Sequence, residues 1–310
     1  MEEESWVIST LSRALAFSTP LLWGALGEVY AERAGVINLG IEGMMLFGAL
    51  SAFAGAYTTG SPGLGLLLAA AVGSLMALVH AFVAITLRAN QYVAGLALSM
   101  LGSGLAGLLG RGWVGVPLPT PLPNVSLPVL STLPFFGPAM FTAQSPVTYL
   151  GLLLAVVLWF GLFYTRWGMV IRSTGESPVT ADTLGVSVAL VRYLAVAFGG
   201  ALAGVAGGFL SVAYRPAWTE GMTAGMGWIA LAIVILAAWD PLRALAGALL
   251  FGALYHLAFR LQAWVAPELL RILPYICTIV ALTLTRLSPA RRWQGAPAAL
   301  GLAYVRGERQ

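Results

Sequence analysis

The chain has 310 residues, of which 59% are hydrophobic and only 9% are charged, and its mean hydropathy is +0.87. Soluble domains carry about 25% charged residues, so the composition excludes a soluble protein and predicts a membrane protein built from helices. All 16 basic residues are arginine, which excludes a P-loop ATPase and a lysine Schiff-base enzyme. The net charge of +4 does not indicate nucleic-acid binding, because the arginines lie at the ends of apolar runs.

Nine apolar segments follow one another along the chain, and most are long enough to cross a hydrocarbon core about 30 Å thick as helices. The acidic start is unlike a secretory signal, so we expect the first segment to be retained. The sequence predicts an all-α polytopic membrane protein of about nine or ten transmembrane helices in a single domain, residues 1–310. The segments are 6–26, 36–59, 63–87, 91–110, 147–165, 191–213, 226–239, 243–259 and 269–286.

Residues 114–146 carry two proline-rich stretches, 116–123 and 133–138. They are too broken for one straight helix and too apolar for a free linker. We expect an ordered outer loop with a short interfacial element.

Arginine placement predicts the orientation, because positive residues accumulate on the cytoplasmic side. That side then holds the segment 166–190 and the tail 288–310. Nine crossings leave the N-terminus outside, whereas a broken, half-spanning element around residues 24–43 brings it inside. One side has Arg33, Arg88, Arg166, Arg172, Arg192, Arg243, Arg286, Arg291, Arg292, Arg306 and Arg309, and the other has Arg13, Arg111, Arg215, Arg260 and Arg271.

Residues 172–187 form a polar stretch within this predominantly apolar chain. Ser177 is a good N-cap, Pro178 suits the first helical position, Asp182 lies in the body, and Gly185 is placed to end the helix in a left-handed turn. The pattern predicts a helix of about two turns, which is marginal alone and needs tertiary contact. From these residues alone, an ordinary interfacial helix remains an equally good interpretation.

Two motifs carry a resemblance to a known family. Residues 166–186 resemble the cytoplasmic coupling segment of permease subunits in ABC importers for branched-chain amino acids, simple sugars and nucleosides, with Thr180 at a position where alanine is common. Residues 27–45 are similar to the amino-terminal signature of the nucleoside (simple-sugar) branch. The matching residues are Gly168, Arg172, Gly175, Glu176, Pro178, Ala181, Gly185 and Val186 in the first motif, and Glu32, Arg33, Gly35, Asn38, Gly40, Glu42 and Gly43 in the second.

The resemblance implies a type II-like importer permease architecture in the bacterial plasma (inner) membrane, with a coupling helix that docks on a separate ATP-binding subunit. ATP and Mg²⁺ would be bound by that partner, so this chain would hold no cofactor and catalyse no reaction. The other implied partners are a second related permease and an extracytoplasmic substrate-binding protein or lipoprotein. The implied coupling residues are Arg172, Gly175, Glu176, Ser177, Pro178, Ala181, Asp182 and Gly185.

Four polar residues near segment ends are candidates for a translocation path: Asn38, Glu42, Asn90 and Gln91. Polar groups inside a membrane protein are functional candidates by default. For Glu42 a structural role is favoured, either as a partner of Arg33 or as an acceptor for loose backbone between residues 35 and 43.

Small residues at four-residue intervals, Gly200, Gly204 and Gly208, predict one closely packed helix face. His80, His256 and Cys277 lack the spacing of metal ligands, so we interpret them as packing or interface residues. On the predicted outer side, Tyr214, Trp218 and Glu220 would form part of a mouth or, as the favoured interpretation, an interfacial aromatic belt.

Three functions compete at this stage. The leading one is an ABC importer permease for nucleosides, with a simple-sugar permease as its alternative. An ion-coupled secondary transporter would usually need mid-membrane charges and often internal repeats, whereas the central spans are uncharged. A membrane-embedded enzyme would need a cluster of catalytic side chains.

Overall fold

The computed structural model describes residues 2–134, 136–262, 276, 279, 280, 283 and 295–306, and within them the chain is helical with isolated β-bridges but no strand. The longer helices are α1 Glu2–Arg33, α2 Ile41–Thr59, α3 Pro62–Ala81, α4 Gln91–Gly110, α6 Pro146–Tyr164, α9 Val188–Phe209, α10 Met226–Leu236 and α11 Pro241–Leu261. The shorter elements are α5 Phe136–Met140, α7 Arg166–Glu176, α8 Pro178–Thr183, the π-helical turns η1 Phe82–Thr86 and η4 Leu210–Tyr214, and the 3₁₀ turns η2 Arg111–Trp113 and η3 Leu130–Thr132.

The prediction of an all-α polytopic membrane protein is confirmed. Each of the first eight predicted segments holds a helix, and five helices of the described residues are long and apolar enough to cross a membrane, with α10 shorter. The ninth segment, which contains Cys277, lies almost wholly outside the described residues, as do 288–294 and 307–310 of the tail. The five spans are Pro62–Thr86, Gln91–Trp113, Pro146–Tyr164, Val188–Tyr214 and Pro241–Ala258.

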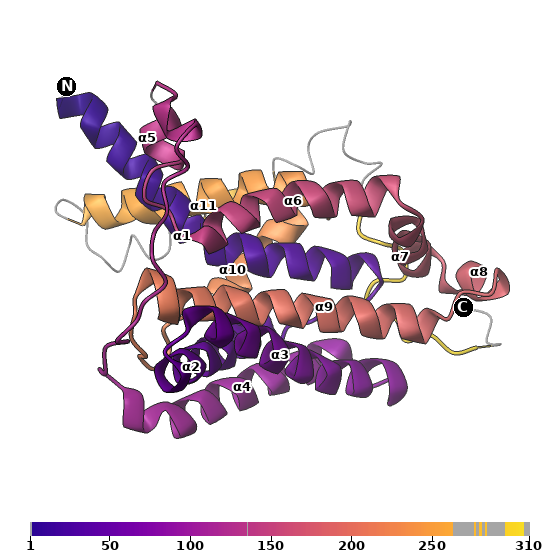
Figure 1. Ribbon diagram of the computed structural model, residues 1–310. Coiled ribbons are helices and arrows are strands. Elements are labelled where there is room, and N and C mark those ends of the chain that lie inside the picture. Colours follow the sequence, from indigo (N-terminus) through magenta and orange to yellow (C-terminus); the bar gives the residue numbers. More distant parts are fainter. Residues whose placement is uncertain are drawn as a thin grey trace.

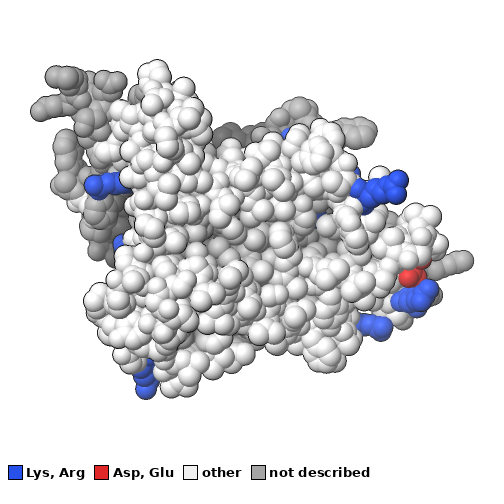
Figure 2. Space-filling view, viewed as in Figure 1, with Lys and Arg blue, Asp and Glu red and all other residues white. Residues whose placement is uncertain are grey.

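The long helices run roughly side by side between two ends (Figure 1). One, the α5 end, holds α5 and the start of α1; the other, the α8 end, holds α7, α8 and residues 295–306. The start of α1 therefore lies on the same side as the proline-rich loop. On the face in Figure 2, most of the charged side chains lie at the two ends and the middle is largely uncharged, as expected for a protein that crosses lipid.

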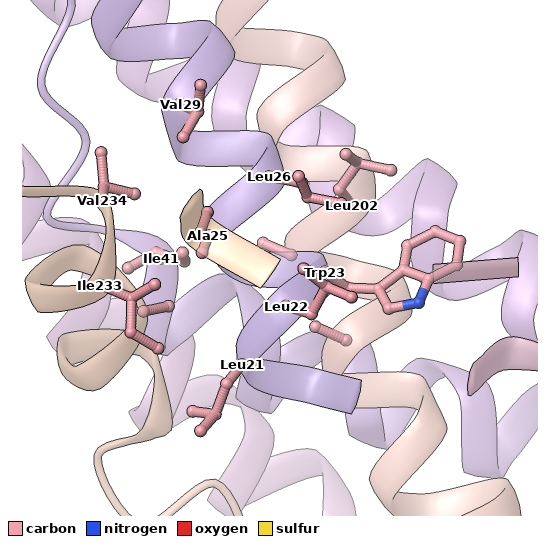
Figure 3. Packing of buried hydrophobic residues seen from close by; sticks show 14 of the residues in the cluster. Leu21, Leu22, Trp23, Ala25, Leu26, Val29, Ile41, Leu202, Ile233 and Val234 are labelled. Carbon is pink, nitrogen blue, oxygen red and sulfur yellow. The ribbon is translucent and has the colours of Figure 1, made fainter. Parts of the chain in front are cut away.

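Helix α1 is the centre of the core. It packs against α9, α10 and α11, and its Leu21 and Leu26 are buried together with Ile41 of α2, Leu202 of α9 and Ile233 of α10 (Figure 3). In a membrane-spanning bundle such helices are held together by close van der Waals packing, because lipid tails are as apolar as these side chains. Helix α1 also contacts α5, α6 and α7.

Helix α9 approaches α3 and α2 through its small residues. A methyl group on Gly200 would overlap Ala77 of α3, and one on Gly204 would overlap the carbonyl oxygen of Ala69. Gly208 lies against Ala52 of α2 and Ala69. The structure therefore places Gly200 and Gly204 where a side chain would overlap the backbone of α3, and Gly208 where it would crowd side chains of α2 and α3.

We expect Gly204→Ala to destabilise the protein by about 1–3 kcal/mol, because overpacking a filled contact forces the helices apart. The matched control is Gly104→Ala on α4, where a methyl group meets nothing within 4 Å. Thermal unfolding in detergent checks this: the melting temperature should fall for Gly204→Ala and hold or rise for Gly104→Ala. Equal melting temperatures would contradict the close contact.

Candidate functional site

The predicted helix in the polar stretch is present, with the predicted ends. The Ser177 hydroxyl accepts a hydrogen bond from the Thr180 amide at 3.4 Å, and Pro178 occupies the first turn of the six-residue helix α8. Gly185 adopts φ +85°. The Gly185 amide donates to the Asp182 carbonyl at 2.9 Å and the Val186 amide donates to the Ala181 carbonyl at 3.0 Å. This pair of bonds is the Schellman arrangement, which satisfies carbonyls at a helix end.

The residues proposed for coupling differ in exposure. Gly175, Pro178 and Ala181 are buried, Arg172 and Asp182 are half-buried, and Glu176, Ser177 and Gly185 are exposed. The sequence analysis missed two apolar side chains on the outer surface here, Val179 and Leu184, which are 40% and 78% exposed. The sequence does contain a signal for these two residues, since both are apolar and lie inside a polar stretch. Apolar side chains beside a membrane-spanning bundle's polar end suit a protein partner.

Residues 295–306 bind directly to this segment. The Ala299 amide donates to the Gly175 carbonyl at 2.9 Å, and the Gly301 amide donates to the Gly35 carbonyl at 3.1 Å. The Ala298 amide donates to the Glu176 carboxylate at 3.3 Å. The tail therefore ties α7 to the turn after α1.

An ion pair adds to these bonds: Arg306 Nε lies 3.1 Å from Asp182 Oδ2. Arg306 is largely exposed, so the pair contributes at most about 1 kcal/mol. Desolvation and, after it, the Asp182 carboxylate raise the pKa of the Tyr304 phenol.

Helix α7 packs against the end of α1 without any intervening side chain. A methyl group on Gly175 would overlap the carbonyl oxygen of Arg33. Phe163 of α6 lies between two guanidinium groups, 5.3 Å from Arg172 and 5.9 Å from Arg33, which is cation–π distance. Helix α7 and the end of α1 are therefore in direct contact.

The chain between α1 and α2, residues 34–40, is not helical and turns back into the bundle. Gly35, at φ +93°, ends α1: its amide donates to the Glu32 carbonyl at 2.9 Å, and the Val36 amide donates to the Ala31 carbonyl at 3.1 Å. Non-helical backbone is tolerated at membrane depth only where protein groups satisfy it. This turn therefore needs nearby polar side chains.

Two of the four candidate path residues supply such groups. The Gln91 side chain accepts from the Ile37 amide at 2.8 Å, and the Asn38 side chain accepts from the Gly40 amide at 3.1 Å. The backbone amide of Asn38 donates to the Glu28 carboxylate at 2.8 Å. His80 Nε2 donates to the Ile37 carbonyl, also at 2.8 Å. Asn38, Gln91, Glu28 and His80 are all buried.

Glu42, the third candidate, is in the first turn of α2, and its carboxylate lies against the start of α10. Its Oε1 accepts from the Thr223 hydroxyl at 2.6 Å and from the Gly225 amide at 2.9 Å, and its Oε2 accepts from the Gly227 amide at 2.7 Å. A carboxylate at a helix N-terminus satisfies free amides and is favoured by the helix dipole. The backbone that Glu42 satisfies is thus that of residues 225–227, and not that of residues 35–43.

The other end of α10 is held by Arg33. Its Nε donates to the Trp239 carbonyl at 3.0 Å, and its Nη2 donates to the Ala238 carbonyl at 3.2 Å. Arg33 therefore pairs with these carbonyls and not with Glu42. The Trp239 indole donates to Glu32, and Asp240 caps α11 by accepting from the Leu242 and Arg243 amides.

Two further predicted residues have local structural positions. Asn90, the fourth candidate, is exposed and caps α4 by accepting from the Tyr92 and Val93 amides. Trp218 is completely buried under the proline-rich loop, whose Gly115 amide donates to its carbonyl. The expectation that Trp218 lies in an outer mouth or an interfacial belt is therefore wrong, because the loop packs over it.

A cavity of about 600 Å³ opens at the α8 end. Its walls include Arg33, Glu176 and Asp240 with the aromatic rings of Trp159 and Phe163. None of the four candidate path residues lines it. Within the described residues, no group of three or more His, Cys, Asp or Glu side chains is placed to hold a metal.

Comparison with protein families settles which class this arrangement represents. Residues 10–282 match the family described as the permease component of the branched-chain amino acid transport system. The chain belongs to this permease family. It is therefore a multi-pass plasma-membrane subunit of an ABC transport system, a system that also comprises an ATPase and a substrate-binding protein.

Three relatives align over nearly the whole chain. A Haloferax volcanii protein provisionally named a glucose ABC transporter permease is 39% identical, covering 97% of this chain and 99% of its own. A guanosine ABC transporter permease of Bacillus subtilis is 35% identical, covering 95% and 96%. A nucleoside ABC transporter permease of Lactococcus lactis is 33% identical, covering 97% and 99%. No solved structure matches the chain.

We expect Glu42→Ala to destabilise the protein by about 1.5–3 kcal/mol, because it leaves the Gly225 and Gly227 amides without their acceptor. The matched control is Glu220→Ala, which removes an exposed carboxylate from the loop that precedes α10. Hydrogen exchange should accelerate at residues 225–229 in Glu42→Ala alone. Unchanged exchange there would show that Glu42 does not hold the start of α10.

Proposed function

We propose that this chain is a nucleoside-carrying permease subunit of an ABC importer. It forms half of the translocation path, and a second related permease forms the other half. An extracytoplasmic binding protein or lipoprotein delivers the nucleoside, and no nucleic acid is bound. The observation that carries the proposal is that two relatives named as guanosine and nucleoside permeases align over at least 95% of this chain.

In this proposal ATP and Mg²⁺ are bound and ATP is hydrolysed by a separate subunit, and the present chain catalyses nothing. The ATPase docks at the α8 end, against the exposed Val179 and Leu184. The buried Pro178 and Ala181 hold α8 to the bundle while Gly175 contacts the end of α1. Closure of the ATPase therefore moves α7 and α8 as one piece and displaces the turn at residues 34–40.

A simple-sugar permease is the second candidate, because the relative named for glucose is the most identical of the three described here. Both cargoes are uncharged and rich in hydroxyl groups, so uncharged polar side chains suit either one. The nucleoside adds a planar base, which favours aromatic contacts. Transport competition separates the two cargoes.

The test starts with purification of the chain from its native membrane in mild detergent. A Walker-motif ATPase and a second permease should co-purify in comparable amounts. The complex in proteoliposomes, with the co-purifying binding protein and ATP, should then take up radiolabelled guanosine, and excess glucose should not compete. Uptake of glucose alone would select the sugar permease, and recovery of the chain without an ATPase would contradict the proposal.

Gly185→Val should uncouple ATP hydrolysis from uptake, because a β-branched residue disfavours φ +85° and removes the stop of α8. Uptake per ATP hydrolysed should fall at least severalfold while the amount of chain in the membrane is unchanged. Gly112→Val is the matched control, since Gly112 is at the α5 end and a Cβ there meets nothing within 4 Å. If uptake per ATP hydrolysed were equal in the two variants, α8 would have no coupling role.

A further inference from the structure

A second cavity at the α8 end, of about 480 Å³, borders the coupling segment but is assigned no ligand in the proposed transport cycle. It lies where η1, α8, the start of α9 and the tail come together. Three arginines, Arg88, Arg192 and Arg306, line it with one carboxylate, Asp182. Since Asp182 already pairs with Arg306, the lining residues leave an excess of positive charge around Arg88 and Arg192.

Arg192 is the unusual member, because it is charged and only 2% exposed. Its Nε donates to the Ala34 carbonyl at 3.1 Å and its Nη1 donates to the Leu302 carbonyl at 2.9 Å. Its Nη2 is buried and has no hydrogen-bond partner among the described residues. These acceptors are neutral, and a buried charge is costly without a counter-charge. An anion nearby would therefore stabilise the Arg192 guanidinium.

The start of α9 adds donors to the same cavity. Ser187, Val188 and Ala189 line it, and the Ser187 side chain makes no capping hydrogen bond. The first amides of a 22-residue helix are consequently free of a side-chain cap at its positive end. Such helix starts bind phosphate groups. Arginine charge and free amides thus converge on one half-open cavity.

Apolar side chains lie next to this charged cavity along the same helices. Phe82 and Leu87 flank its η1 wall, and Leu190 and Leu194 follow its α9 wall; all four are exposed. A free phosphate needs no such surface, whereas the acyl chains of a lipid do. Basic pockets between helices on the cytoplasmic side are known to suit lipid headgroups.

We propose that this cavity binds the phosphate of an anionic phospholipid from the cytoplasmic leaflet. The phosphate lies between Arg88, Arg192 and the first turn of α9, and the acyl chains run along Phe82 and Leu190. Because Asp182 of α8 and Arg306 of the tail share the cavity, the lipid also supports the arrangement of the α8 end. Lipid binding is independent of which substrate is transported.

Native mass spectrometry of the purified full chain tests this, with phosphatidylglycerol and phosphatidylcholine offered as an equal mixture. One phosphatidylglycerol per chain should be retained in preference to phosphatidylcholine. Arg88→Gln should weaken retention about fivefold, as expected for one arginine near a lipid surface. Asp182→Asn should strengthen it, because it removes the carboxylate. Arg166→Gln, which removes an exposed arginine at the same end outside the cavity, should leave it unchanged.

Equal retention of the two lipids, or equal weakening by Arg88→Gln and Arg166→Gln, would overturn the site. A second arm adds inorganic phosphate in large excess. Phosphatidylglycerol should stay bound, since phosphate lacks the acyl-chain contacts. Displacement of the lipid by phosphate would contradict the lipid assignment and show that the cavity binds free phosphate instead.

Discussion

The fold depends on how the two ends of α10 are satisfied. This helix has 11 residues and spans about 16 Å, roughly half of a hydrocarbon core. One of its ends therefore lies inside the bundle, where bare backbone groups would cost several kcal/mol each. Glu42 supplies the acceptors at the start and Arg33 the donors at the end. Each charge also opposes the helix dipole at its own end.

These two residues belong to α2 and α1 and are separated by the turn at residues 34–40. The turn thus fixes the distance between the groups that hold α10, and it is itself in contact with α7 and the tail. The α8 end is thus connected to α10 through the backbone of this turn and the side chains of Arg33 and Glu42.

The sequence predicted the features that follow from local chemistry. Ser177, Pro178 and Gly185 mark the ends of α8 because capping and left-handed turns are properties of a few neighbouring residues. Apolar length located the helices, but it ended the first segment at residue 26, whereas α1 continues to Arg33. Glu28 and Glu32 interrupt the apolar run, yet the backbone amide of Asn38, ten residues on from Glu28, and the distant Trp239 indole bind them within the core. The burial of Trp218 and the tail contacts of Gly175 likewise depend on distant segments, which periodicity cannot reveal.

The tail has a consequence for how the protein is made. Residues 295–306 supply bonds to Gly175, Gly35 and Asp182, and they leave the ribosome after every described helix. A nascent chain can insert its helices while the α8 end is still missing these bonds. Completion of that end therefore follows the synthesis of every described helix. A partner that recognises the finished end would thereby assemble with complete chains and pass over truncated ones.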